Sequence, residues 1–155
     1  MKKATCLTIV VLMLIGIIGT IPAYADEKRN GETYKKLNYN DILRNPMSNW
    51  GVNYVVEGIV LQRFNEENKR QPNYPYICFR IATKGKTGNS VVCRIASTLE
   101  NTFGVSSIIE GDKVKVYCSC DGKKNYTTVL GAAVSTPIFK IYSYEDIYVT
   151  VPKKD

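Results

Sequence analysis

Short segments in which apolar and polar residues alternate recur along this chain and limit it to a small set of folds. Residues 113–120 show the pattern most clearly: Val114, Val116, Cys118 and Cys120 would share one face, and lysine, tyrosine and serine would share the other. A period of two is typical of a β-strand with one buried face. The sequence therefore predicts a mostly β protein.

More strands are expected before this segment. Residues 52–61 are partly apolar on both faces, as in a strand that bends across a closed barrel, and Gly58 would let this strand coil tightly there. Residues 77–81 and 91–95 alternate in the same way, and a glycine-containing hairpin turn is expected between them at residues 84–89. Together they predict a strand followed by a hairpin.

The rest of the chain carries turn signals and further β segments. Residues 64–75 are polar with two prolines and are expected to form a loop. Asp121-Gly122 is a strong signal for a β-hairpin turn. Residues 126–134 and residues 137–149 are expected to contain the last strands.

Two short helices are expected between strands. The first, within residues 34–45, would be capped by Asn38 or Asn40 and would stop before Pro46. The second, within residues 97–109, would open at a serine or threonine and break at a glycine. The resulting order of three strands, a helix and two strands is the plan of an OB barrel, although periodicity alone supports any small β barrel or sandwich.

The first 25 residues have the three parts of a secretory signal peptide. Lys2 and Lys3 form a positive start, residues 4–22 carry no charge, and Ala23-Tyr24-Ala25 is a small-x-small cleavage site. We expect cleavage and a secreted or cell-envelope location. The alternative is an uncleaved anchor, because about 18 apolar residues can just span a bilayer.

The predicted domain organisation follows from this segment. Residues 1–25 are the signal peptide, 26–37 a flexible mature N-terminus, 38–149 a single OB-fold domain and 150–155 a tail.

Cysteines remain in the mature chain at positions 78, 93, 118 and 120, an even count that in an exported protein raises the idea of two disulfides. The strand phases argue against it, because Cys78 would point outward and the other three inward. The sequence leaves open whether there is one disulfide, two or none. No zinc site is expected, because Cys-x-Cys lacks the usual Cys-x-x-Cys spacing.

A set of short motifs follows a fixed order over residues 38–147. They are Asp41–Pro46, Trp50-Gly51, Val56–Val60 and Ile108–Tyr117, then Gly122, Tyr126, Gly131 and Pro137-Ile138. In order and spacing they resemble the tRNA-anticodon-binding-like OB-fold domains of exported proteins and lipoproteins of Gram-positive bacteria. The resemblance implies a five-stranded OB-type Greek-key barrel, with a short N-terminal helix, a short helix between strands 3 and 4, and a nucleic-acid-binding role. This chain departs from the group by lacking a lipidation cysteine.

OB barrels bind ligands on the outer face of strands 2 and 3, between the loops that join strands 1–2 and 4–5. Cationic side chains with interleaved tyrosines occupy these places and suit a phosphate backbone with stacked bases. Glu66 and Glu67 in the first loop would repel phosphate. The predicted ligand-binding residues are Arg63, Lys69, Arg70 and Tyr74 in the first loop, Tyr76, Arg80 and Arg94 on the strands, and Lys123, Lys124 and Tyr126 in the second loop.

The residue types favour binding over catalysis. The chain has no histidine, the commonest general base and metal ligand, so no metal or cofactor is expected. Its carboxylates are scattered at turns and strand ends, which disfavours a secreted OB-fold nuclease. A formal net charge of +7 suits an anionic partner such as single-stranded nucleic acid or an acidic glycan. The alternatives are a module that binds an envelope or host protein, and a basic face that serves solubility alone.

Overall fold

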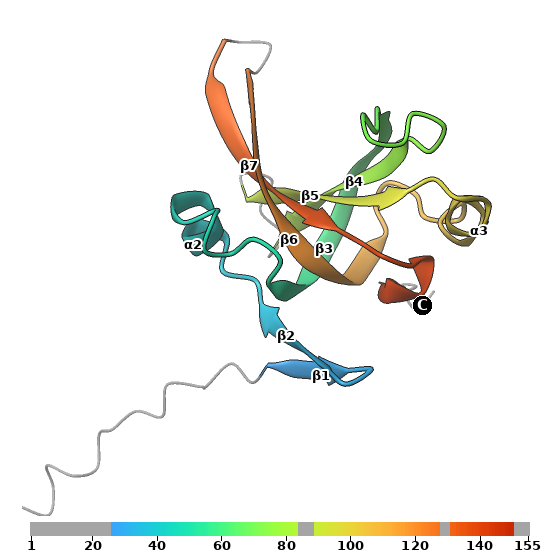
Figure 1. Ribbon diagram of the computed structural model, residues 1–155, viewed down its shortest axis with the longest axis horizontal. Coiled ribbons are helices and arrows are strands. Elements are labelled where there is room, and N and C mark those ends of the chain that lie inside the picture. Colours follow the sequence, from blue (N-terminus) through green and yellow to red (C-terminus); the bar gives the residue numbers. More distant parts are fainter. Residues whose placement is uncertain (1–25, 84–88, 128–130, 151–155) are drawn as a thin grey trace, which may run out of the picture.

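The computed structural model describes residues 26–83, 89–127 and 131–150. The predicted signal peptide, most of the predicted turn at 84–89 and all but the first residue of the predicted tail lie outside the described residues. Within them the chain forms one sheet with short helices at its margins (Figure 1). The predicted mostly β class is confirmed.

Five strands of this sheet form a partial ring. In order of pairing they are β3 (Asn53–Glu66), β4 (Tyr76–Thr83), β5 (Ser90–Ala96), β7 (Ala133–Lys140) and β6 (Lys113–Thr127), and β6 pairs again with β3. The β5–β7 pairing is parallel and covers three residue pairs, whereas the other four are antiparallel. The ring encloses the apolar core, in which Phe79 and Phe139 are among the largest fully buried side chains.

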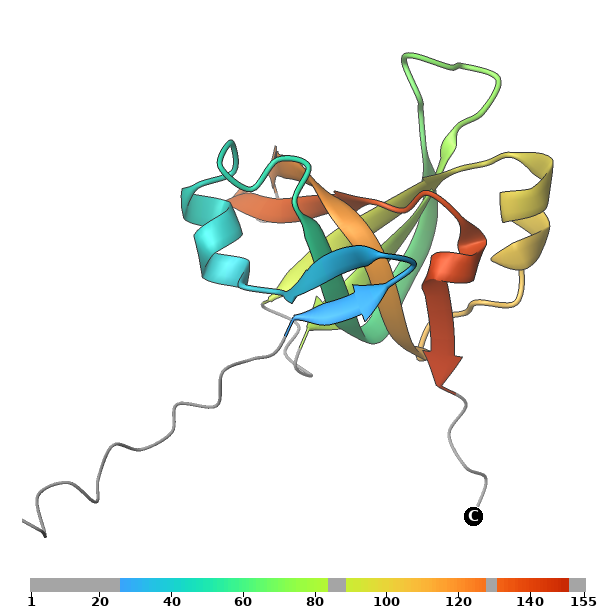
Figure 2. The same cartoon turned by 60° about the horizontal axis from the view of Figure 1, so that its bottom comes forward.

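Three further strands extend the sheet, so it has eight strands and not the predicted five. They are β1 (Glu27–Arg29), β2 (Glu32–Lys36) and β8 (Ile147–Thr150). We expected residues 26–37 to be flexible, but β1 and β2 form an antiparallel hairpin and β2 pairs in parallel with β3. This hairpin is polar and lies across the outside of the sheet (Figure 2), where it needs no apolar alternation.

Side-chain contacts hold the β1–β2 hairpin in place. Arg29 Nη1 lies 3.1 Å from Asp146 Oδ1, and the guanidinium carbon lies 4.8 Å from the ring centre of Tyr117. Two residues earlier on β1, Glu27 accepts hydrogen bonds from Lys115 Nζ at 2.9 Å and from the hydroxyl of Tyr117 at 2.8 Å. The polar residues that made this segment look flexible therefore provide its tertiary contacts.

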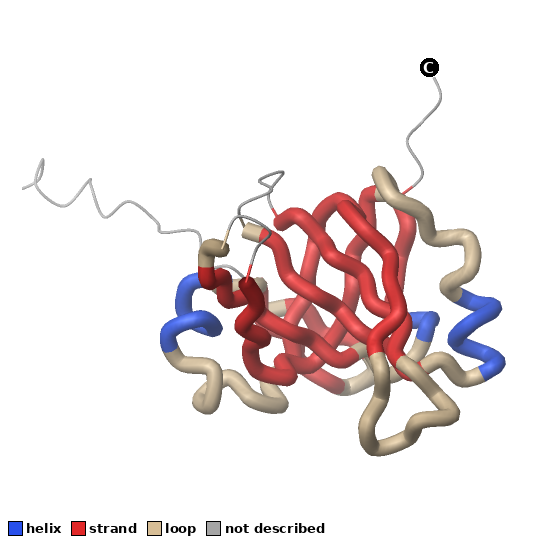
Figure 3. Tube along the Cα trace, turned by 90° about the horizontal axis from the view of Figure 1, so that it is seen from above, coloured by secondary structure: helices blue, strands red, loops and turns tan. Residues whose placement is uncertain are grey.

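The first predicted helix is present as α2 (Tyr39–Arg44). Asn38, and not Asn40, is its N-cap, and its side-chain oxygen accepts from the Asp41 backbone N–H at 3.2 Å. Ile42 projects from the helix into the core and is fully buried. Figure 3 shows α2 and the second helix at opposite ends of the sheet.

The second predicted helix is α3 (Leu99–Gly104), which is capped by Thr98. It packs against the single-turn helix η1 (Tyr144–Asp146). A Cβ on Gly104 would lie 2.1 Å from Cγ of Tyr144, so glycine is required where the two helices meet. The predicted break at this glycine coincides with the end of the helix.

The predicted hairpin turn at Asp121-Gly122 is wrong. β6 continues through these residues to Thr127, and its register with β7 shifts between Cys120 and Lys123. Gly122 has φ of 92°, so the Asp-Gly pair forms an irregularity within the strand that resembles a glycine bulge, not a turn. The predicted loop at 64–75 is also shorter than expected, because β3 extends to Glu66.

The four cysteines are all buried and free, and no disulfide joins them in the part of the chain that the structure describes. Cys93, Cys118 and Cys120 lie in the core, as the strand phases predicted. Burial raises the pKa of the Cys118 thiol well above its ordinary value, with the neighbouring Cys93 as the next cause. These thiols therefore pack as small apolar groups.

Candidate functional site

Two projections flank the outer surface of β4 and β5. The connection between β3 and β4, residues 67–75, rises on one side, and the β6–β7 hairpin rises on the other (Figure 1). We call the surface between them the β4–β5 face and define it by the outward side chains of Tyr76, Cys78, Arg80 and Arg94. Cys78 and Arg94 are direct partners across the two strands.

Arg94 lies opposite Cys78 on this face. Its guanidinium carbon is 4.6 Å from the ring centre of Tyr76, and its Nε and Nη2 both donate to Asp121 Oδ2, at 3.2 and 2.5 Å. Burial lowers the pKa of Arg94, but the hydrogen bond and negative charge of Asp121 raise it by more. The bulge in β6 positions this carboxylate, which the sequence placed in a hairpin turn.

A second ion pair lies on the same face. Lys124 Nζ is 2.6 Å from Glu66 Oε1, with the lysine side chain 50% exposed and the glutamate 24% exposed. The other oxygen of Glu66 lies 3.9 Å from the Cys78 sulfur. This pair ties the end of β3 to the base of the β6–β7 hairpin.

Cys78 lies beneath these ion pairs. It occupies an outward position on β4, as predicted, yet the groups above it leave it fully buried. Burial raises the pKa of its thiol to about 12, and the negative charge of Glu66 contributes. A thiol with this pKa stays protonated near neutral pH and is a poor nucleophile.

The exposed cations of the candidate site lie on the two projections. Lys69 and Arg70 in the β3–β4 connection and Lys123 on β6 are exposed, and none of them forms an ion pair within the described ranges. Tyr74, in the β3–β4 connection, is 47% exposed.

The buried Asn68 shapes the β3–β4 connection. Its Oδ1 accepts from the backbone N–H of Arg70 at 3.2 Å, and its Nδ2 donates to the Tyr74 carbonyl at 3.0 Å. Asn68 is not among the predicted binding residues, although an asparagine followed by charged residues and a proline is a turn signal.

Three of the predicted ligand-binding residues do not lie with these exposed cations. Arg80 is half-buried on the face, and its Nε donates to the hydroxyl of Ser90 at 3.1 Å. Tyr126 lies half-buried on β6, opposite Val134, and not in a loop. Arg63 lies in β3, and its Nη1 donates to the Ser106 carbonyl oxygen at 3.2 Å, in the connection from α3 to β6. Arg63 is therefore held at another part of the surface, away from the ion pairs of Arg94 and Lys124.

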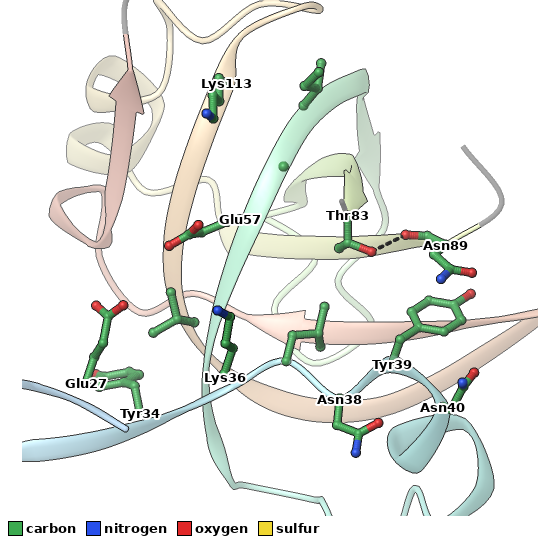
Figure 4. A pocket seen from close by; sticks show the side chains of 14 residues that line it. Glu27, Tyr34, Lys36, Asn38, Tyr39, Asn40, Glu57, Thr83, Asn89 and Lys113 are labelled. Atoms are coloured by element: carbon green, nitrogen blue, oxygen red, sulfur yellow. Dashed lines mark hydrogen bonds between the residues drawn. The ribbon is translucent and has the colours of Figure 1, made fainter. Parts of the chain in front are cut away.

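A separate groove of about 950 Å³ lies over β3, between the end of β2 and the end of β4 (Figure 4). The sequence did not predict it, because the β1–β2 hairpin and α2 supply much of its wall. Charged side chains of both signs line this groove, together with two tyrosines. They are Glu27, Lys36, Glu57 and Lys113, with Tyr34 and Tyr39.

The described residues include no group of three or more histidine, cysteine, aspartate or glutamate side chains that could hold a metal ion. No described helix has the length and apolar character needed to cross a bilayer.

Comparisons with known proteins identify no family. No protein-family model matches the chain, and no curated protein matches its sequence. Among solved structures, the chain is similar to the mitochondrial single-stranded DNA binding protein Rim1 of S. cerevisiae in two crystal forms. One comparison has a TM-score of 0.43 with 13% identity, covering 64% of this chain and 94% of that chain. The other has a TM-score of 0.42 with 15% identity, covering 64% and 95%. Values this low carry no argument about what this chain binds.

Proposed function

We propose that this chain is an exported, non-catalytic module with an OB-type barrel, and that it binds single-stranded nucleic acid on the β4–β5 face. The barrel assignment rests on the pairing order of β3, β4, β5, β7 and β6, with α3 between β5 and β6. In such a barrel the second and third strands, here β4 and β5, carry the ligand. Export rests on the signal-like composition of residues 1–25.

The arrangement of cations around aromatic rings carries the proposal. Lys69, Arg70 and Lys123 have no acidic partner among the described residues. Lys69 and Arg70 share the β3–β4 connection with the exposed ring of Tyr74, and Lys123 lies on the other projection. Between the projections, Tyr76 offers a second ring. Cations that follow a phosphate backbone, with rings on which bases stack, are the usual means of binding single strands without sequence preference.

A second candidate function is supported by the outer side of α3. Leu99 is 75% exposed and Phe103 is 71% exposed, and their spacing of four residues places both side chains on one side of the helix. Large apolar side chains exposed together are typical of protein–protein contacts. An envelope or host protein would dock there, away from the β4–β5 face.

The decisive experiment measures fluorescence anisotropy of a labelled mixed-sequence single-stranded oligonucleotide with residues 26–155 at several salt concentrations. We compare the wild type with a triple variant, Lys69→Gln, Arg70→Gln and Lys123→Gln. The matched control removes two lysines and one arginine elsewhere on the surface: Lys28→Gln, Lys35→Gln and Arg44→Gln.

We expect affinity that falls with salt, and a slope of log affinity against log salt that the triple variant reduces by about 2, because each phosphate contact on a single strand contributes about 0.7. The control should keep most of the wild-type slope. Equal losses in the two triple variants would show that net charge, and not this face, drives binding. An absence of binding at low salt would reject nucleic acid as the ligand.

A further inference from the structure

Two cations of the β4–β5 face, Arg94 and Lys124, are already bound by carboxylates, whereas Arg80 donates to the Ser90 hydroxyl. Arg94 is held by Asp121, and both side chains are 21% exposed. Lys124 is held by Glu66 at 2.6 Å. In contrast, the exposed cations at the edges of the face have no acidic partner in the described part of the chain.

A phosphate would need the same donors that these carboxylates use. Arg94 directs Nε and Nη2 at one oxygen of Asp121, which is the geometry with which a guanidinium also binds a phosphate oxygen. Glu66 likewise places an oxygen at the head of Lys124. Glu66 lies 3.9 Å from the Cys78 sulfur, and Arg94, which holds Asp121, is the cross-strand partner of Cys78, so a strand crossing β4 and β5 would pass both ion pairs.

We propose that Glu66 and Asp121 are specificity residues that occupy the phosphate positions of the empty face, and that a bound strand displaces them from Lys124 and Arg94. This inference rests on the proposed function. An intramolecular carboxylate is present at a high effective concentration, so a single phosphate competes with it poorly. A polynucleotide already held by Lys69, Arg70 and Lys123 gains the same advantage and completes the exchange. The face therefore selects polymers over mononucleotides and inorganic phosphate.

The contact between Arg94 and Tyr76 supports this exchange. The ring faces the guanidinium at 4.6 Å independently of Asp121. When Asp121 is displaced, the ring still restricts where the guanidinium lies, so its donors remain directed outward for a phosphate.

The test compares the affinity for a mixed-sequence single-stranded DNA oligonucleotide among the wild type, Glu66→Gln and Asp121→Asn. Both substitutions keep size and hydrogen-bonding capacity and remove the competing charge. The control, Glu57→Gln, removes an equal charge from an exposed glutamate of β3 that lies 3.6 Å from Lys115, outside the face. Thermal unfolding of each variant checks that the fold is retained.

We expect each face variant to bind about fivefold more tightly at about 0.15 M salt. Its salt slope should stay close to that of the wild type, because in the proposed exchange both complexes make the same phosphate contacts. At the same salt concentration the control should change affinity by less than about twofold, because a Debye length of about 8 Å screens an exposed charge that lies outside the face. Inorganic phosphate at millimolar concentration should not displace the oligonucleotide from the wild type.

The outcomes separate this inference from the proposed function. If the wild type binds but the face variants gain no more than Glu57→Gln, the exchange is rejected and nucleic-acid binding stands. If no variant binds, both are rejected. A second measurement on the wild type avoids reliance on variants: the Nε–H resonance of Arg94 should shift when the oligonucleotide saturates the protein, and an unchanged resonance would reject the displacement of Asp121.

Discussion

Gly58 lies where β3 has no room for a side chain against β4, and Gly58→Ala tests whether the ring is as tight as the structure shows. An added Cβ would lie 2.1 Å from the backbone oxygen of Ala82 and 2.7 Å from Cγ2 of Ile81. The first atom belongs to a strand that is paired on both sides, so it cannot move without breaking the β3–β4 register. The sequence predicts that Gly58 lets the strand coil tightly, and the structure adds that no side chain fits between Gly58 and Ala82.

The expected destabilisation follows from these contacts. Overpacking of a well-packed core costs about 1–3 kcal/mol. A strand hydrogen bond lost in the adjustment adds about 1 kcal/mol. We therefore expect Gly58→Ala to lower the free energy of unfolding by about 3 kcal/mol, a large part of the roughly 5–15 kcal/mol typical of a small domain.

The assay is urea denaturation followed by far-UV circular dichroism, with Glu57→Ala as the control on the neighbouring residue. Glu57 has a side chain that is 57% exposed and one ion pair with Lys115, so its loss should change stability by less than about 1 kcal/mol. A Gly58→Ala variant as stable as Glu57→Ala would refute the argument that β3 and β4 approach each other this closely.

Three further predictions concern the hairpin and the buried thiol. Arg29→Ala removes the ion pair with Asp146 and a cation–π contact, so deuterium exchange of the β1 amides should accelerate roughly tenfold; unchanged exchange would contradict the role of Arg29. Hydrogen bonds from Lys115 and Tyr117 hold the pKa of Glu27 below its ordinary value of 4.5, so its contribution to docking is present above that pH and disappears as the pH falls through the lowered pKa. Amide resonances of β1, followed by NMR from pH 6 to pH 2.5, should shift in that acidic range and stay constant above it. Because burial raises the pKa of the Cys78 thiol to about 12, iodoacetamide at pH 8 should label Cys78 only after unfolding; mass spectrometry that finds rapid labelling of the folded protein would contradict this.

Sequence patterns correctly predicted the elements that depend only on neighbouring residues. The alternation over residues 113–120 predicts the buried face of β6, and the structure buries Val114, Val116, Cys118 and Cys120. The asparagine before the first helix and the threonine before the second are both caps, because a cap needs only a side chain and the backbone three residues ahead.

The same local reasoning failed where a segment takes its conformation from distant partners. Asp121-Gly122 has the composition of a turn, but pairing with β3 and β7 on either side carries β6 beyond it, and the glycine allows the register to shift. Residues 26–37 have no apolar alternation, but Arg29 and Glu27 dock on side chains 88 or more positions away in the chain. A sequence pattern with a short period cannot report such contacts.

For the candidate site, the sequence shows which cations and tyrosines are available and predicts the order of strands that brings many of them to one face. Which of these cations are paired depends on the folded structure. It pairs Arg94 with Asp121 and Lys124 with Glu66, holds Arg63 elsewhere, and leaves Lys69, Arg70 and Lys123 without acidic partners among the described residues. The physical reason is that charge interactions act over a few ångströms in space, and the closing of the ring sets which charges come that near.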